Sequence, residues 1–172
     1  YSTFGVSNAE AVQAHATIDA YVAYYTIDGK TQFIVPNSLA VSLTTANEDL
    51  RKELMPVAKS EANNLSELKK AITYYAEKSG KRVTLEAALL HNKNTDKISA
   101  QNLISFARGA DVNINLIPWN PVSCLPFEEP SSSEVKNFVY QLESAGLNVT
   151  LRTRRGRKIG GACGQLGKVT EN

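Results

Sequence analysis

Short apolar segments alternate along this chain with longer segments of helical period, and this alternation constrains the fold most. Residues 39–43, 82–90, 112–117 and 148–152 are rich in apolar and β-branched residues and are predicted to be strands. Strands that alternate with helices pair in parallel through crossover connections. The chain is therefore predicted to be an α/β protein, either an open parallel sheet or part of a (β/α) barrel.

The segments between these strands carry helix start and stop signals. Apolar residues at helical spacing run from Leu65 to Tyr75, after Asn64 in an N-cap position, and Gly80 closes this helix. A weaker helix is expected at 99–108, and a third opens at Ser131 and ends at Gly146. Residues 8–24 also have helical period, and Asp28-Gly29 after them is a hairpin-type turn signal. If residues 1–4 end a first strand, the order is β-α-β-α-β-α-β-α-β.

Composition is that of one globular domain. The chain has 172 residues, of which 42% are hydrophobic and 21% charged. No apolar run approaches the ~18–20 residues that span a bilayer. Cys124 and Cys163 form neither a CxxC pair nor a disulfide framework, and His15 and His91 complete no metal-ligand spacing. We therefore expect an intracellular protein in a reduced state, with no metal ligand of its own.

Positive charge is concentrated near the C-terminus. Six of the 19 Lys and Arg residues fall between Arg152 and Lys168, and no acidic residue interrupts that stretch. It is either a surface for a phosphate-bearing partner or a solvated terminal run. Cys163 lies there among glycines, where nearby cations favour the thiolate, although many free cysteines are idle or structural.

Residues that follow the predicted strands are polar, small or rigid. In α/β folds, ligands bind at the carboxyl ends of the strands, so these residues predict one ligand-binding edge. Trp119 could stack on a base or pack the rim, and we favour packing. Glu86, inside a strand, could be a buried base or a structural hydrogen-bond partner, and we favour the second. His91 could line the site or have a structural role in its loop.

Four segments carry a resemblance to a known family. Residues 41–57 read VSLTTANEDLRKELMPV, residues 83–86 read VTLE, residues 115–121 read NLIPWNP, and Arg155-Gly156 is followed by ACGQL at 162–166. This pattern resembles the radical-SAM adenine-C2 methyltransferases of ribosomal and transfer RNA, the RlmN–Cfr type. The resemblance implies that residues 1–172 are the C-terminal half of a radical-SAM partial (β/α) barrel. The family's cluster-binding loop and N-terminal RNA-binding domain lie upstream of the matching region.

The resemblance also implies roles for individual residues. Cys163 matches the catalytic cysteine that receives a methyl group from S-adenosylmethionine (SAM) before the carbon passes to C2 of an adenine in 23S rRNA or tRNA. The positions that match SAM contacts are Ser2, Ser42, Leu43, Thr44 and Asn120. The residues expected to hold RNA phosphates are Arg152, Arg154, Arg155, Arg157 and Lys158. The [4Fe–4S] cluster, an electron donor such as a flavodoxin system, a monomeric state and a cytoplasmic location are implied for the full-length protein.

Departures from the family pattern leave alternatives open. Thr44 stands where the family usually has His, Ala46 replaces a usual Pro, Cys124 has no counterpart, and the segment 23–37 looks like a surface insertion. The chain could instead be a non-catalytic RNA-binding relic of this fold, or an unrelated α/β enzyme that binds phosphate. We favour the methyltransferase, and expect the chain alone to be inactive and to self-associate through uncovered strand edges.

Overall fold

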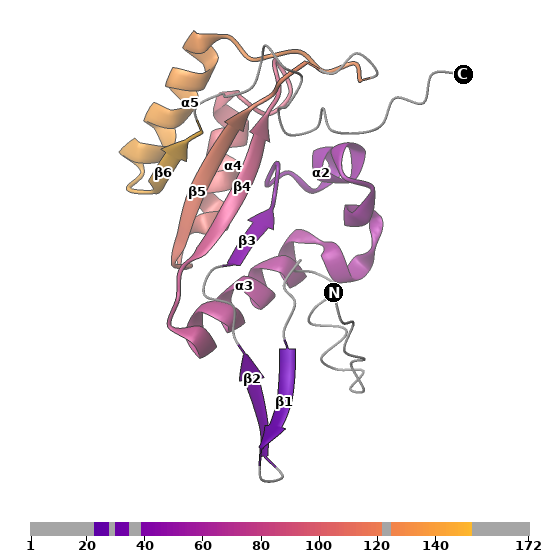
Figure 1. Cartoon of the computed structure of the whole chain (residues 1–172). Coiled ribbons are helices and arrows are strands. Elements are labelled where there is room, and N and C mark those ends of the chain that lie inside the picture. Colours follow the sequence, from indigo (N-terminus) through magenta and orange to yellow (C-terminus); the bar gives the residue numbers. More distant parts are fainter. Residues whose placement is uncertain (1–22, 28–29, 35–38, 122–124, 153–172) are drawn as a thin grey trace, which may run out of the picture.

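The computed structural model describes residues 23–27, 30–34, 39–121 and 125–152 (Figure 1). The strands are β1 (Ala23–Ile27), β2 (Lys30–Ile34), β3 (Leu39–Ser42), β4 (Val83–Leu89), β5 (Val112–Pro118) and β6 (Asn148–Leu151). The helices are α2 (Glu48–Leu54), α3 (Leu65–Ser79), α4 (Lys97–Ala107) and α5 (Ser132–Ser144), and the 3-10 turns η1 (Pro56–Lys59) and η2 (Glu61–Asn63) precede α3.

Four of these strands form one parallel sheet in the order β3-β4-β5-β6. Each strand of this sheet therefore pairs with the next one along the chain, and a helical crossover returns the chain to the same starting edge. The parallel α/β architecture predicted from the alternation of patterns is confirmed, and β5 extends through Pro118, one residue beyond the predicted end.

Cap residues explain where the long helices begin and end. The Asn64 side chain accepts a hydrogen bond from Glu67 N at the start of α3, and Gly80 ends that helix at φ 64°. A full capping box starts α5, because Ser131 and Glu134 each bind the other's backbone N–H. Both helices thus begin at the polar residues from which they were predicted.

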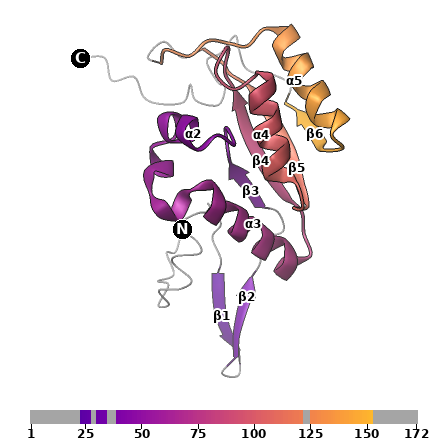
Figure 2. The same cartoon turned by 180° about the vertical axis from the view of Figure 1, so that it is seen from behind.

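The helices α3, α4 and α5 cover one face of the sheet, as Figure 2 shows from behind. Their apolar side chains form a core with alternate residues of β3, β4 and β5. The strand members of this core are Leu39, Val41, Val83, Leu85, Ala87, Leu89, Val112, Ile114 and Leu116, and Leu43, directly after β3, joins them. We call this the covered face. The opposite side, toward the viewer in Figure 1, carries no helix of the described residues and is called the open face.

A separate antiparallel hairpin precedes the sheet. In it, β1 pairs with β2 so that Tyr24 lies opposite Phe33. The predicted helix at 8–24 is therefore wrong for Ala23 and Tyr24, which belong to a strand, and residues 8–22 lie outside the described residues. The aromatic and β-branched sequence of 24–27 favours a strand over the end of a helix. The Asp28-Gly29 turn signal lies between the two paired strands.

Candidate functional site

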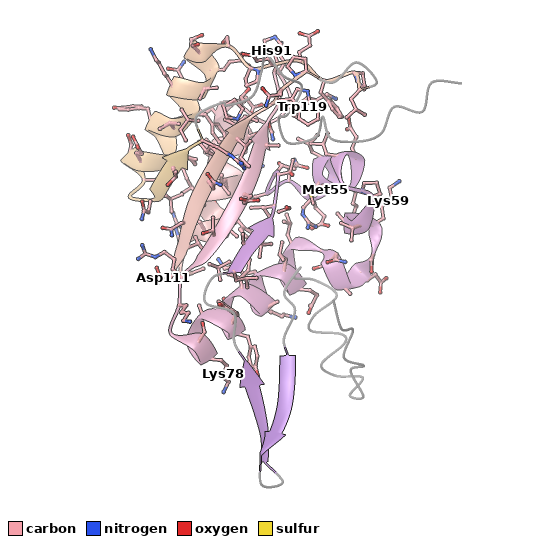
Figure 3. The ribbon with its side chains drawn as sticks, in the orientation of Figure 1. Met55, Lys59, Lys78, His91, Asp111 and Trp119 are labelled. Carbon is pink, nitrogen blue, oxygen red and sulfur yellow. The ribbon has the colours of Figure 1, made fainter. Side chains whose placement is uncertain are left out.

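The carboxyl ends of the four parallel strands meet at one edge of the sheet, which we call the carboxyl edge. His91, just after β4, and Trp119, just after β5, lie at this edge in Figure 3, whereas Asp111 lies at the opposite edge. The topology therefore brings the predicted ligand-binding segments after β3, β4, β5 and β6 to one end of the fold.

The chain leaves β3 through a tight, strained turn. The N–H groups of Leu43 and Thr44 both donate to the Glu86 carbonyl, at 2.9 and 3.1 Å, and Thr45 N donates to the Leu43 carbonyl at 2.7 Å. Thr44 sits in the middle of this turn at φ 59°. A β-branched residue at positive φ costs about 1–3 kcal/mol, and such strain clusters at ligand sites.

A buried asparagine holds this turn in place. Asn94 is 2% exposed, and its side-chain amide donates to the carbonyls of Thr44 and Ala88 at 3.0 and 2.8 Å. Its Oδ1 accepts from Leu90 N at 2.8 Å. Asn94 thus ties the ends of β3 and β4 together. Sequence reasoning missed it, because a single Asn in a polar loop gives no signal of burial.

Polar side chains line the open face near the carboxyl edge. Ser42, Glu86, Asn115 and Thr150 are register partners across the four strands, so they form a row on one face of the sheet. Asn115 Nδ2 donates to Glu86 Oε1 at 3.1 Å. Central parallel strands that are covered on both faces are apolar on both. The half-buried polar pair in the middle of this sheet therefore indicates a face that meets solvent or a ligand.

A carboxylate anchors the loop after β4 to the start of α5. Glu134 accepts hydrogen bonds from His91 Nδ1 at 2.7 Å, Thr95 Oγ1 at 3.0 Å and Ser131 N at 2.8 Å. Burial acts to raise the Glu134 pKa, but the hydrogen bonds from Ser131, His91 and Thr95 together outweigh it and lower that pKa to about 2. The carboxylate therefore stays ionised, and His91 is fixed in its loop rather than free at the rim.

Aromatic side chains pack the rim beside this loop. The rings of Trp119 and Phe127 meet edge to face, with centroids 5.8 Å apart. Phe127 and His91 also line an open hollow of about 180 Å³. Sites for small-molecule ligands usually enclose roughly 300–1,000 Å³. This hollow is too small for a nucleoside-sized ligand. The open face beside it is the better candidate for such a ligand.

Comparison with known proteins agrees with this architecture. No family model matches the chain. It is 60% identical over 131 residues to a probable dual-specificity RNA methyltransferase RlmN of Treponema denticola, and 56% identical over 131 residues to the one of Treponema pallidum. These matches cover 76% of this chain, but only 37% and 38% of the two relatives. This chain is homologous to part of the RlmN-type methyltransferases. It spans a little over a third of their length.

A solved structure supports the same relationship. The crystal structure of a radical SAM methyltransferase from Sphaerobacter thermophilus superposes with a TM-score of 0.71 at 38% identity, covering 74% of this chain and 37% of that one. The resemblance drawn from the NLIPWNP motif and its neighbours is therefore confirmed. The fold predicted for the described residues, parallel strands with crossover helices of a radical-SAM methyltransferase, is confirmed as well.

The predicted SAM-contact residues of this RlmN homologue fall into two groups. Ser42 is exposed on the open face, and Thr44 and Asn120 are half-buried at the carboxyl edge. Leu43 differs, because its side chain is fully buried in the core and its N–H donates to the Glu86 carbonyl. Its own carbonyl accepts from Thr45 N, which leaves one lone pair of that oxygen for a ligand. Ser2 lies outside the described residues.

Most of the predicted catalytic and RNA-binding residues also lie outside the described part of the chain. These are Cys163, Arg154, Arg155, Arg157 and Lys158, and Cys124 lies outside it too. Arg152 is exposed at the carboxyl edge, where its backbone N–H donates to the Leu116 carbonyl at 2.8 Å. The start of the basic segment is thus placed at the same edge as the predicted SAM contacts.

The fit of the family's cofactors differs between SAM and the cluster. A face with a serine hydroxyl, a carboxylate and an amide oxygen suits SAM, which carries a positive charge and several hydrogen-bond donors. By contrast, no group of three His, Cys, Asp or Glu side chains in the described residues could hold a metal ion. Those residues provide no site for the iron–sulfur cluster. None of the described helices is long and apolar enough to cross a membrane.

Proposed function

We propose that this chain is the C-terminal portion of a SAM-dependent RNA methyltransferase that modifies C2 of an adenine in 23S rRNA or tRNA. The observation that carries the proposal is the polar open face that ends at the strained turn around Thr44, in a chain homologous to RlmN-type enzymes. A parallel sheet that is polar on one side, and that no described helix covers there, has the character of a ligand site next to its carboxyl edge.

Ser42, Thr44 and Asn120 are proposed to bind SAM, together with Ser2 and the backbone of Leu43. Ser42 supplies a hydroxyl on the open face, and the strained turn at Thr44 is held ready by Asn94. A turn fixed before the ligand arrives lowers the entropy lost on binding. Bound SAM would supply the methyl group, and the chain's own residues orient it at the carboxyl edge.

Cys163 is proposed as the thiol that accepts the methyl group, and the basic segment as the surface for RNA. A thiolate beside Arg154 and Arg155 would be stabilised by their charge and is nucleophilic at neutral pH. Arg152, at the carboxyl edge, supports the placement of the segment's start. The RNA-binding set is completed by Arg154, Arg155, Arg157 and Lys158, which would hold phosphates.

The whole protein is proposed to bind its [4Fe–4S] cluster through residues other than those described here. An electron donor such as a flavodoxin system, a monomeric state and a cytoplasmic location belong to the same proposal.

The test uses the protein encoded by the complete coding sequence that contains this chain. Reconstituted enzyme is incubated with methyl-labelled SAM and transcripts of 23S rRNA and tRNA, and the modified nucleosides are identified by mass spectrometry. We expect 2-methyladenosine, abolished by Cys163→Ala and retained in the control Cys124→Ala. RNA that is bound but never methylated would favour the non-catalytic relic. Methylation that survives Cys163→Ala would contradict the role given to that thiol.

A further inference from the structure

Glu86 occupies a position that links the strained turn to the open face. Its backbone carbonyl accepts two N–H groups, from Leu43 and Thr44, and so fixes the turn after β3. Side chains alternate along β4, and the side chain of the preceding Leu85 is completely buried on the covered face. The side chain of Glu86 therefore lies on the open face. One residue therefore supports the candidate SAM site through its backbone and faces it through its side chain.

Only one oxygen of the Glu86 carboxylate has a hydrogen-bond partner among the described residues. Asn115 Nδ2 holds Oε1 at 3.1 Å, and Oε2 has no hydrogen-bond partner among the described residues. No cation of the described residues forms an ion pair with this side chain; the described ion pairs involve other carboxylates. A half-buried carboxylate that is fixed on one oxygen and open on the other is arranged to accept from a ligand.

The neighbours of Glu86 select the kind of ligand group. Ser42 is its register partner on β3, and neighbouring strands lie about 4.8 Å apart. A molecule that touches Ser42 on this face is therefore within reach of Glu86. Asn115 donates an N–H of its side-chain amide to Glu86, and the Oδ1 atom of the same amide remains as a second acceptor. The three side chains present acceptors, so they complement a ligand group rich in N–H or O–H donors.

We propose that Glu86, held by Asn115, is a SAM-binding residue that accepts hydrogen bonds from the ribose hydroxyls or the ammonium group of the ligand. This inference rests on the proposed function. Glu86 is then a charged residue of the site in addition to those expected from the sequence, and it lies within a strand rather than after its end. Glu86 touches the ligand, and Asn115 is the residue that positions it.

The test measures SAM binding to the protein encoded by the complete coding sequence that contains this chain, by isothermal titration calorimetry. Glu86→Ala is expected to weaken SAM binding by roughly 10-fold or more, since a hydrogen bond to a charged group is lost. Glu86→Gln keeps one acceptor oxygen and is expected to weaken binding by about 3-fold to 10-fold. Circular dichroism and thermal unfolding establish that each variant is folded.

The matched control is Thr84→Val. Thr84 lies on the same strand and face, one row farther from the carboxyl edge, and is half-buried like Glu86. Its substitution is expected to change SAM affinity by less than about 2-fold, as for positions away from a contact. If Thr84→Val weakens binding as much as Glu86→Ala, or if neither Glu86 variant changes it, the inference is overturned.

Two ligand analogues separate the two donor groups. Methylthioadenosine keeps the ribose but lacks the amino-acid end, whereas S-adenosylhomocysteine keeps both. If Glu86 accepts from the ribose, Glu86→Gln weakens binding of both analogues; if it accepts from the ammonium group, only S-adenosylhomocysteine and SAM are affected. A wild-type protein, from the complete coding sequence, that binds none of the three would overturn the SAM site and this inference together. Normal binding in both Glu86 variants would overturn this inference alone.

Discussion

The two faces of the four-stranded sheet come from the same strands but have opposite chemistry. On the covered face, residues such as Leu85 and Ile114 are completely buried beneath the helices. On the open face, their neighbours Glu86 and Asn115 are half-buried and bonded to each other. Because side chains alternate along a strand, one face can stabilise the fold while the other keeps polar groups for a ligand. Stability and binding can therefore be altered separately by substitutions at neighbouring positions of the same strand.

The largest expected effect tests the covered face. Leu85→Ala removes a fully buried side chain from the middle of β4 and is expected to lower the free energy of unfolding by about 2–5 kcal/mol. The adjacent Thr84→Ala, on the open face, is expected to cost less than about 1 kcal/mol. Urea unfolding of both variants measures the difference. Equal losses would mean that the two faces do not differ in the way described.

The second prediction concerns the junction between the sheet and the carboxyl edge. Asn94→Ala leaves buried carbonyl and N–H groups of the β3 and β4 ends without their partner. We expect a loss of about 1–3 kcal/mol in the free energy of unfolding. The control Gln101→Ala, at an exposed position of α4, is expected to change it by less than about 0.5 kcal/mol. A tolerant Asn94 would show that the turn does not depend on this side chain.

The third prediction uses pH to separate the loop anchor from the sheet. The pKa of Glu134 is about 2 in the folded chain against an ordinary 4.5, so its ionised form stabilises the fold. This contribution is fully present above about pH 4.5 and is lost as the pH falls toward 2. Glu134→Gln is expected to cost about 1–2 kcal/mol near pH 7 and to flatten the acid side of the stability profile. Thermal unfolding between pH 2 and pH 7 provides the measurement, and an equally steep profile in the variant would refute the anchor.

The smallest predicted effect tests the strained turn. Thr44→Gly is expected to raise the free energy of unfolding by about 0.5–1 kcal/mol, because glycine adopts φ 59° without the steric cost of a β-branched side chain. Gly80→Ala, at φ 64° with open space around the added Cβ, is the converse change and is expected to lower it by about 1 kcal/mol. Chemical unfolding of the pair checks both signs. A destabilised Thr44→Gly variant would show that the turn stores no strain.

The described fold was largely predictable because its signals are local. Strand 39–42 and helix 65–79 follow from short-range periodicity, and caps such as Asn64, Gly80 and the Ser131–Glu134 box lie within a few residues of the helix ends they fix. The error at Ala23 and Tyr24 has the same origin. These two residues pair with Ile34 and Phe33 of the next strand. A helical period within residues 8–24 carries no information about that pairing.

The candidate site was predictable only in part. Ser42, Thr44 and Asn120 followed from motifs and from their places after strands. The hydrogen bond between Asn115 and Glu86 joins residues 29 positions apart, so the local sequence around Glu86 could not predict that Asn115 is its partner. That bond gives Glu86 a structural hydrogen-bond partner, as expected, and it leaves Oε2 for the ligand contact proposed above. Asn94 was missed altogether, since its burial is set by the packing of two strand ends.

Binding of SAM to the open face at the carboxyl edge can be observed by nuclear magnetic resonance of the isotope-labelled protein that contains this chain. On titration with SAM, the amide signals of Ser42, Thr44, Glu86 and Asn120 are predicted to shift and saturate together. Signals from the opposite edge, such as Asp111, are predicted to stay in place. Shifts that gather at the opposite edge or on α3–α5, or an unchanged spectrum at high SAM concentration, would contradict the account.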